Sequence, residues 1–323
     1  MSSGHDESGF HLRDLQTIED YARVFELEKL VWALQTGDDA VPVNFFAASV
    51  KRGAILIGAF DVSGALTGFV YSFPGLKGGR LVQWSHMLGV APGFQGSGLG
   101  YRLKLAQRER AIAQGIDLVE WTFDPLQAGN AHFNFSKLGV VAAEYLRDVY
   151  GQSDSPLHKG TPTDRLVAEW HLRDPRVLEK LRETAASAAL PTGESIRATG
   201  RVSGGGAEIG KVGVAPGEIP VGAVGERAAG ARAAPVVNTY ETRGPWQVPV
   251  GEPDLSCEAT TVQVAVPANF TRMLAEAPDM AQAWRLATRS IFEAYFDRGY
   301  RATDFVRDAE TGGGRYVLRA IMH

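Results

Sequence analysis

The chain has 323 residues, a formal net charge of −4 and a pI near 6.0. This length exceeds one ordinary α/β domain and predicts two. The acidic balance lacks the basic surface that binding to a phosphate backbone requires, so it disfavours nucleic acid as a partner and favours a small molecule.

Cysteine content and hydropathy exclude two further classes of protein. A single cysteine, Cys257, rules out an internal disulfide framework, and no apolar run approaches the roughly 18 residues of a membrane span. The opening MSSGHDESG has neither the basic segment nor the apolar core of a secretory signal. We therefore expect a cytoplasmic protein with no membrane partner, whose first nine residues form a disordered tail.

The first half of the chain alternates helix and strand signals. Phe10 to Asp14 predicts a short strand, and Thr17 is the expected N-cap of a helix that runs to about Leu34. A second helix is expected over Val43 to Lys51. The first helix carries apolar residues three and four apart, which predict one buried stripe made of Tyr21, Val24, Phe25, Leu27, Leu30 and Val31.

Three strands and a further helix follow. Ala54 to Asp61 and Ala65 to Phe73 predict an antiparallel hairpin around Ser63-Gly64, and Leu81 to Val90 predicts the next strand. A helix then ends at Gln114 with Gly115 as its C-cap. The segment LVEWTFDP supplies another strand.

The segment GFQGSGLG lies between the predicted strand that ends at Val90 and this helix. Amides in the first turn of a helix lack backbone partners and favour an anion. With glycine at positions 96, 98 and 100, several amides can converge on a phosphate or pyrophosphate. No Gly-Lys-Ser/Thr follows, so a Walker loop is excluded, and the position after a meander disfavours a dinucleotide loop. A turn that only connects strand to helix is the alternative.

The sequence QGSGLG resembles the Gln/Arg-x-x-Gly-x-Gly/Ala loop of the GNAT acyl-CoA N-acyltransferase superfamily, within a subgroup of long single-chain members. The flanking VAP and RLKLAQRERAIAQG fit, and NFSKLG resembles the motif on the helix after the fifth strand. The resemblance covers about Phe10 to Leu172. It implies an α/β (α+β) fold, with a mixed, mostly antiparallel sheet flanked by helices.

This resemblance also implies a coenzyme site. Acetyl-CoA or another acyl-CoA would be the co-substrate, with its pyrophosphate held by loop amides and its pantetheine arm beside the end of the fourth strand. The implied residues are Leu88, Gly89 and Val90 for pantetheine, Gln95, Gly96, Ser97, Gly98, Leu99, Gly100 and Tyr101 for pyrophosphate, and Asn130 and Lys137 as further contacts.

Acyl transfer to an amine needs a base, because the amine is mostly protonated at neutral pH. Alternation along Trp84, His86 and Leu88 places His86 on one strand face near the expected thioester, and its ordinary pKa suits the role. A buried histidine bonded to a backbone carbonyl is the alternative. Glu120 is a second candidate base, although a structural role is the commoner one for such a residue, and the Leu88 N–H is a candidate oxyanion donor.

The residue at the family's usual general-acid position differs from the family pattern. Many members carry a tyrosine four residues before the glycine of the helix motif, and this chain has Phe135 there. Phenylalanine cannot donate a proton, so Tyr145, Tyr150 or water would have to protonate the leaving thiolate.

Arg165 is a candidate for a bidentate pair with a substrate carboxylate, and a surface pair with Asp164 is its alternative role. Asn130, His132 and Asn134 share a helix at spacings that fit no zinc site. We therefore expect no metal.

Beyond Leu172 the composition changes. Asp174 to Ala188 predicts a helix capped by Asp174. The tract between 200 and 230 is rich in glycine and predicts a flexible linker, with a hairpin over residues 211–224 as the alternative.

The end of the chain predicts a second, smaller α/β domain. Strands are expected at Thr260 to Pro267, Tyr300 to Val306 and Arg315 to Ile321, with a helix over Met280 to Gly299. The order echoes Leu81 to Phe123, which indicates a degenerate GNAT-like half; a small cap on the first domain is the alternative.

The expected organisation is a tail (1–9), an acyl-CoA-binding domain (10–172), a helix and linker (173–245) and a C-terminal domain (246–323). The expected function is an N-acyltransferase that moves acetyl or succinyl to a primary amine of a small molecule such as an amino acid. The alternative is a non-catalytic acyl-CoA sensor or partner-binding protein. A homodimer through an exposed sheet edge is compatible with the sequence.

Overall fold

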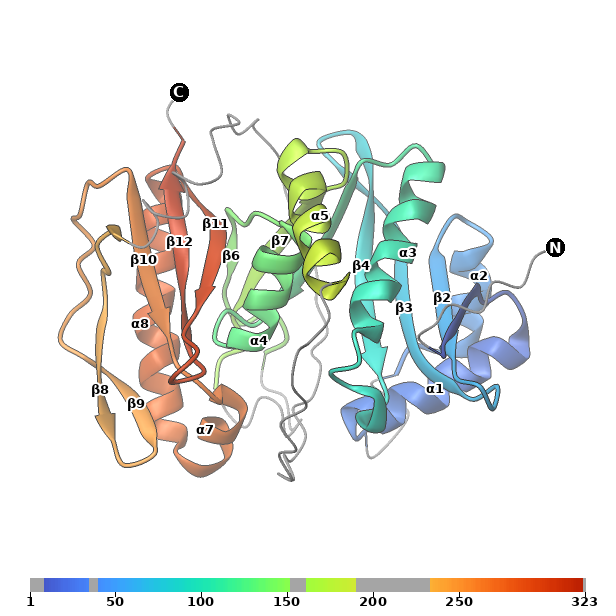
Figure 1. The fold of residues 1–323 in the computed structure, drawn as a ribbon, viewed down its shortest axis with the longest axis horizontal. Coiled ribbons are helices and arrows are strands. Elements are labelled where there is room, and N and C mark those ends of the chain that lie inside the picture. The colour runs from blue at the N-terminus through green and yellow to red at the C-terminus, as the bar shows by residue number, and fades with distance from the viewer. Residues whose placement is uncertain (1–8, 35–39, 152–160, 190–232, 322–323) are drawn as a thin grey trace. The chain divides into compact units, whose positions relative to one another are not determined.

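The computed structural model describes residues 9–34, 40–151, 161–189 and 233–321 (Figure 1). The chain forms two compact units, and the boundary between them falls inside one strand, between Trp121 and Thr122. Residues 1–8 of the expected tail, the glycine-rich tract between 200 and 230 and the alternative hairpin at 211–224 lie outside the described residues. The domain boundaries expected from the sequence stay predictions.

The first unit is a sheet with helices on both faces. Strands β1 to β4 pair antiparallel in chain order, and β5 joins β4 in parallel. This confirms the predicted mixed, mostly antiparallel sheet. The elements are β1 (His11–Asp14), α1 (Ile18–Trp32), α2 (Val43–Val50), β2 (Ile55–Phe60), β3 (Leu66–Lys77), β4 (Arg80–Val90), α3 (Leu99–Ala113) and β5 (Leu118–Phe123).

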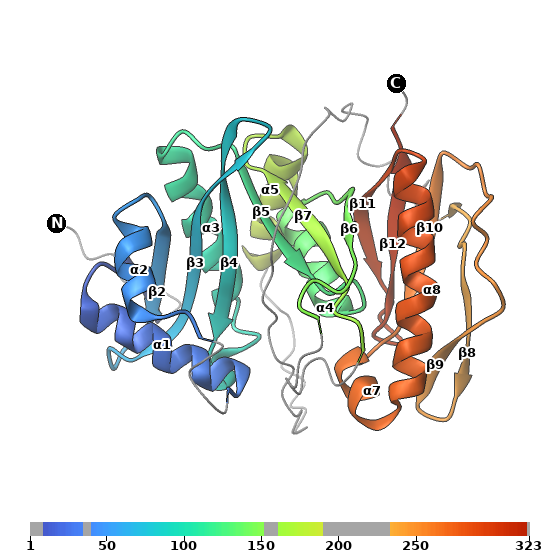
Figure 2. The ribbon, with the colours of Figure 1, turned by 180° about the vertical axis from the view of Figure 1, so that it is seen from behind.

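The two faces of this sheet carry different helices. On one face the Tyr71 hydroxyl donates to Ser49 Oγ of α2 at 2.7 Å, and the Tyr71 ring packs edge-on against Phe46. On the other face Gly68 lies directly under Leu103 of α3, where a Cβ atom would approach the leucine to 3.2 Å. Figures 1 and 2 show α3 on the face opposite α1 and α2.

Helix α1 begins as predicted, but its buried stripe is rotated. The Thr17 side chain accepts from the Asp20 amide at 3.2 Å and caps the helix. Leu30, expected in the stripe, is 59% exposed, and Phe25 is half-buried. The structure buries Glu28 instead, at helical spacing from Tyr21 and Val24. A prediction from apolar residues alone therefore places the buried stripe a fraction of a helical turn away from its position in the structure.

Strand β4 contains a bulge that changes which side chains share a face. Tyr71 pairs with Met87, and the next residue, Ser72, pairs with Ser85, so His86 is the extra residue. The His86 ring packs against Tyr71, on the α2 face. Leu88 lies near Gly100 of α3, on the opposite face. The predicted alternation of Trp84, His86 and Leu88 on one face is wrong, because the bulge breaks the period of two.

The second unit combines the segment after Trp121 with the C-terminal end of the chain. Its elements are α4 (Ala128–Ala131), the π-helical turn η2 (His132–Leu138), β6 (Tyr145–Leu146), β7 (Arg165–His171), α5 (Pro175–Ala189), β8 (Thr239–Arg243), β9 (Trp246–Val250), β10 (Thr261–Val266), α7 (Phe270–Glu276), α8 (Pro278–Asp297), β11 (Tyr300–Arg307) and β12 (Gly314–Ala320). The hairpin β8–β9 and helix α7 were not predicted.

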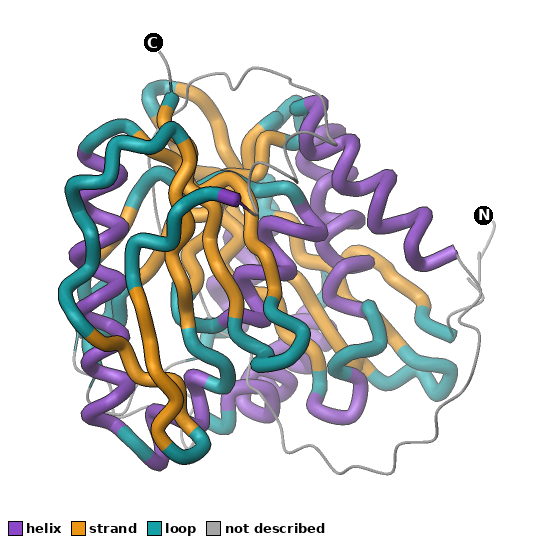
Figure 3. The backbone as a smooth tube through the Cα atoms, turned by 60° about the vertical axis from the view of Figure 1, so that its left-hand side comes forward, coloured by secondary structure: helices purple, strands orange, loops and turns teal. Residues whose placement is uncertain are grey.

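A strand-helix-strand-strand order occurs twice along the chain. In both β5–β7 and β10–β12, the last strand in sequence lies between the two earlier ones. The sequence predicts that the C-terminal segment resembles Leu81 to Phe123. In the structure its strand order matches that of the segment that starts at β5. Reciprocal backbone bonds of 2.9 and 2.8 Å link Ala142, just before β6, to Ala302 of β11. Figure 3 shows α8 beside the strands of this unit.

Candidate functional site

The glycine-rich loop lies between β4 and α3, after the short 3-10 turn η1 (Pro92–Phe94). Gly96 and Gly98 have φ values of 80° and 81°, a left-handed conformation that side chains with a Cβ rarely adopt. Gly98 is the N-cap of α3, and the residues from Gln95 to Gly98 are exposed. The glycines at 96 and 98 are therefore required by the backbone path of the loop.

Two polar side chains of the loop bond to its own backbone. Gln95 Nε2 donates to the Val90 carbonyl at 3.3 Å, and the Ser97 hydroxyl donates to the Phe94 carbonyl at 2.7 Å. The first turn of α3 contains no acidic residue. Because its amides have no partners within the helix, this end carries partial positive charge. A helix start of this kind offers main-chain amides as donors to an anion.

The end of β4 lies beside this loop. A Cβ atom on Gly100 would stand 3.7 Å from Leu88 and 3.9 Å from Val90, so helix and strand are in close contact. Gly89 packs under Phe69, where a Cβ would approach the ring to 2.7 Å. The structure thus brings the residues predicted for pantetheine, Leu88 to Val90, together with those predicted for pyrophosphate.

Pairing between β4 and β5 is short within the described residues. Gln83 pairs with Val119 and Trp84 with Glu120, whereas β4 continues to Val90. The bulge at His86 lies two residues beyond Trp84, the last of these paired residues of β4. It therefore marks the point at which β4 departs from β5.

His86 is half-buried among aromatic rings. Its ring centroid lies 6.1 Å from that of Tyr71 and 5.8 Å from that of Phe73. The bulge positions it on the α1 and α2 face of the sheet.

Glu28 of α1 is a polar group that the sequence analysis missed. Glu28 is only 1% exposed, and its Oε2 atom accepts a hydrogen bond from the Val41 amide at 2.9 Å. Oε1 is buried and has no hydrogen-bond partner in the described part of the chain. Burial raises the pKa of Glu28 to about 8, against the opposing effect of the Val41 amide. A glutamate on an otherwise apolar stripe was the sequence signal.

Glu120, predicted as a second base, is held in a buried ion pair. Lys77 Nζ donates to Glu120 Oε1, and both side chains are almost fully enclosed. The arrangement favours the structural role, because a carboxylate bound to a lysine in the interior is a poor proton acceptor.

Lys104 of α3 is a second buried cation of this unit. Its Nζ donates to Ser85 Oγ at 2.8 Å and Gln107 Oε1 at 3.1 Å, and it lies 3.7 Å from the centroid of the Trp121 ring. Burial lowers the pKa of Lys104 well below its ordinary value. The group lies under the bulge, on the face opposite His86.

Tyr145, the first alternative for the general acid, lies in the second unit. Its hydroxyl donates to Asp164 Oδ2 at 2.8 Å, and its ring stacks on Phe292. Burial and the neighbouring Asp164 raise the pKa of Tyr145 well above its ordinary value. Asp164 also accepts two bonds of 2.8 Å from Arg289. The Tyr145 proton is therefore engaged within a buried network.

Arg165, the predicted carboxylate receptor, is also buried in this unit. Its guanidinium lies 3.8 Å from Asp124 Oδ2 and over the ring of Tyr150, the other tyrosine considered as acid. Asp124 accepts two bonds of 2.6 Å from Arg285. The expected surface pair in a turn is wrong, because Arg165 is 1% exposed and its charge is balanced inside the unit.

The remaining predicted residues lie on or before η2. Asn130 is half-buried in α4 and Lys137 is exposed. Phe135 is fully buried, with its ring 5.6 Å from Tyr316 and 6.1 Å from Phe123. All of these residues belong to the second unit, whereas the glycine-rich loop belongs to the first.

No group of three or more His, Cys, Asp or Glu side chains among the described residues could hold a metal ion. None of the helices in that part of the chain is both long and apolar enough to cross a membrane.

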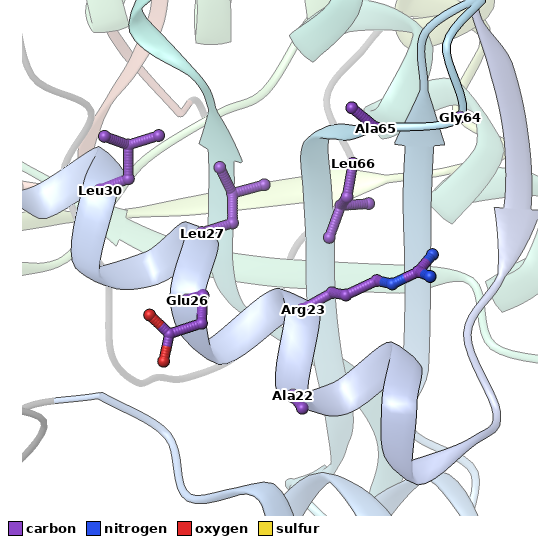
Figure 4. Close-up of a pocket in the computed structure, with 8 residues that line it drawn as sticks. All are labelled: Ala22, Arg23, Glu26, Leu27, Leu30, Gly64, Ala65 and Leu66. Carbon is purple, nitrogen blue, oxygen red and sulfur yellow. The ribbon is translucent and has the colours of Figure 1, made fainter.

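An open surface pocket of about 540 Å³ lies between α1 and the turn that joins β2 to β3 (Figure 4). Leu27, Leu30 and Leu66 supply apolar surface, with Arg23 and Glu26 beside them. None of the residues predicted for coenzyme or catalysis lines this pocket.

Comparison with known proteins gives structural similarities only. No family model matches the sequence, and no curated protein matches it. An acetyltransferase of the GNAT family from Desulfovibrio desulfuricans is 16% identical, with a TM-score of 0.38 over 50% of this chain and 99% of its own. The ribosomal-protein-S18-alanine N-acetyltransferase from Escherichia coli is 16% identical, with a TM-score of 0.41 over 50% of this chain and 94% of its own.

An acetyltransferase from Salmonella typhimurium, solved with acetyl-CoA, is 19% identical, with a TM-score of 0.42 over 51% of this chain and 95% of its own. At these identities and TM-scores the similarity carries no argument for function, which depends on the site.

Proposed function

We propose that the protein is an N-acyltransferase that moves an acetyl or succinyl group from acyl-CoA to a primary amine of a small molecule such as an amino acid. The observation that carries this proposal is the loop from Gln95 to Tyr101. It combines two left-handed glycines, a helix start without acidic residues and direct contact with the end of β4. These features suit a pyrophosphate followed by an extended arm along the strand.

The chemistry requires a proton acceptor for the amine and a donor for the developing oxyanion. His86 at the bulge is the proposed base, because the bulge lies where β4 departs from β5 and turns this side chain out of the regular alternation. The Leu88 amide, two residues along the same strand, is the proposed oxyanion donor. The proton that the leaving thiolate needs is assigned to water, because the Tyr145 hydroxyl is bonded to Asp164.

The test is the release of free thiol from acetyl-CoA and from succinyl-CoA in the presence of a panel of primary amines. We expect thiol release with at least one amine. His86→Ala should lose this activity while the affinity for coenzyme A stays within about twofold. Full activity in His86→Ala would remove His86 as the base.

A non-catalytic acyl-CoA sensor is the second candidate, favoured by one observation. Phe135 stands at the position of the usual acid and is enclosed in an aromatic cluster. Tight binding of coenzyme A without turnover of any amine would favour the sensor. Absence of coenzyme A binding would contradict both candidates.

A further inference from the structure

The second unit contains one pattern of helix, glycine and strand twice. In the first repeat, which runs from α4 to β7, the helical turn η2 ends at Leu138 and Gly139 follows with a φ of 75°. In the second repeat, which runs from α8 to β12, the helix ends at Asp297 and Gly299 has a φ of 81°. The sequences that follow are GVVAAEYLRD from 139 and GYRATDFVRD from 299. They align without a gap and keep glycine, alanine, arginine and aspartate at the same places.

The two repeats also share their strand register. In both, the strand after the glycine pairs antiparallel with the last strand of the repeat. Pairs at aligned positions correspond as follows: Val141↔Glu169 with Arg301↔Arg319, Tyr145↔Leu166 with Phe305↔Tyr316, and Leu146↔Arg165 with Val306↔Arg315. From the first to the second of these pairs, the earlier strand gains one residue over the later strand in each repeat. The similar sequences therefore form the same backbone pairing, irregularity included.

The two repeats meet at residues that are each other's counterparts. Ala142 and Ala302 occupy aligned positions, and the N–H of each donates to the carbonyl of the other, at 2.9 and 2.8 Å. Figures 1 and 2 show β11 beside β6. Pairing of a residue with its own counterpart is the property of an isologous interface, in which two copies are related by a two-fold axis. The edge of the sheet at β6 is therefore a self-complementary surface that is joined to a copy within the same chain.

The side chains that join the two repeats are not symmetric. Asp124, just before the first repeat, accepts two bonds of 2.6 Å from Arg285 of α8, and Asp164, just before β7, accepts two bonds of 2.8 Å from Arg289. Both aspartates are at most 1% exposed. The helical segment of the first repeat cannot supply such cations, because residues 122–136 contain no Arg or Lys. A second copy of the first repeat at this edge would bury both carboxylates without these arginines, which is strongly unfavourable.

We propose that the β6 edge, residues 140–146, is an interaction surface for a copy of the same segment, and that the second repeat is its dedicated partner and closes it to a second copy of the chain. The shared register makes the two repeats fit, and the two aspartate–arginine pairs select the second repeat. A homodimer, which the sequence left open, does not form through this edge. The inference is independent of the proposed function, because it involves neither the glycine-rich loop nor His86.

The experiment uses the full-length chain with Cys257→Ser, which removes the natural cysteine. Ala142→Cys and Ala302→Cys are introduced singly and together. A hydrogen-bonded antiparallel pair has its Cα atoms about 5.5 Å apart, within the range of a disulfide. The control combines Ala142→Cys with Arg301→Cys, because successive side chains of a strand lie on opposite faces. Each protein is oxidised at about 1 and about 100 μM, and its disulfides are identified on non-reducing gels and by mass spectrometry.

We expect the Ala142→Cys/Ala302→Cys protein to form a disulfide within the monomer at both concentrations, at least about tenfold faster than the control pair. The Ala142→Cys protein should form no covalent dimer. Covalent dimers of the Ala142→Cys protein, or disulfides between chains of the double variant, would show that the edge accepts a second copy and would overturn the inference. Failure of the double variant to form any disulfide would contradict the pairing of the two repeats.

A second measurement needs no substitution. Hydrogen exchange of the wild-type amides in 140–146 and 300–306 is followed at the same two protein concentrations. We expect the same protection at both concentrations, because the partner of each segment belongs to the same chain. Protection of residues 140–146 that increases with protein concentration would show that a second copy covers this edge, and the inference would be wrong.

Discussion

Replacement of Glu28 by glutamine should change how the stability of the protein depends on pH. Burial raises the pKa of Glu28 from 4.5 to about 8. Between these two values the folded chain holds a proton that the unfolded chain does not, so the wild type loses stability as pH rises through this window. Below pH 4.5 and above pH 8 the contribution of Glu28 is constant.

The magnitude follows from the same shift. Each pKa unit corresponds to about 1.36 kcal/mol, so a rise of 8 − 4.5 = 3.5 units sets an upper limit of about 5 kcal/mol. Glutamine does not titrate. The free energy of unfolding of Glu28→Gln relative to the wild type should therefore increase by about 3 to 5 kcal/mol between pH 4.5 and pH 8.5.

The assay is urea unfolding followed by tryptophan fluorescence at pH 5, 7 and 8.5 for both proteins. Trp32 and Trp84 report on the first unit, which contains Glu28. Glu26→Gln provides the control and should differ from the wild type by less than about 0.5 kcal/mol at every pH. A difference between Glu28→Gln and the wild type that does not change with pH would refute the reasoning.

Two further predictions concern the second unit. Asp124→Asn leaves Arg285 buried without its carboxylate, and should lower the free energy of unfolding by about 3 to 5 kcal/mol; thermal unfolding with unchanged midpoint would contradict this. Phe135→Tyr places a hydroxyl in an aromatic cluster, so it should cost about 1 to 3 kcal/mol of stability in the same assay. It should also leave thiol release no faster than in the wild type, and a faster rate would show that position 135 can serve as the acid.

Much of the first unit was predictable because local signals agree with the fold. The Thr17 cap, the Ser63-Gly64 hairpin and the glycine-rich loop depend on short-range chemistry, and the structure has all three. The loop was readable because left-handed backbone selects glycine at 96 and 98.

Two errors in this unit have a common cause. The β4 bulge places one extra residue opposite β3, and no side-chain pattern in LVQWSHMLGV signals where it falls. The stripe of α1 was assigned by apolar content, which left out Glu28, although it lies at helical spacing from Tyr21 and Val24, and included Leu30, which is exposed. In both places tertiary contacts decided the outcome.

The second unit was harder to predict because its contacts join distant parts of the chain. Asp124 bonds to Arg285, and Ala142 bonds to Ala302, so the segment from Thr122 to Leu172 shares one unit with the C-terminal strands. The roles considered for Tyr145 and Arg165 came from residue type alone. Their burial and their partners depend on these long-range contacts, which spacing along the sequence does not reveal.

The measurement that tests the central claim most directly is a calorimetric titration of coenzyme A into the wild type, Gly98→Val and Gly93→Ala. Valine at 98 must adopt a φ of +81°, which is strained for a β-branched residue, whereas Gly93 lies in the same turn without a positive φ and with open space around it.

We predict that the wild type and Gly93→Ala bind coenzyme A with similar affinity and that Gly98→Val binds at least about tenfold more weakly. Equal binding by all three proteins would show that the loop is not the pyrophosphate site. Absence of binding by the wild type would contradict the account as a whole.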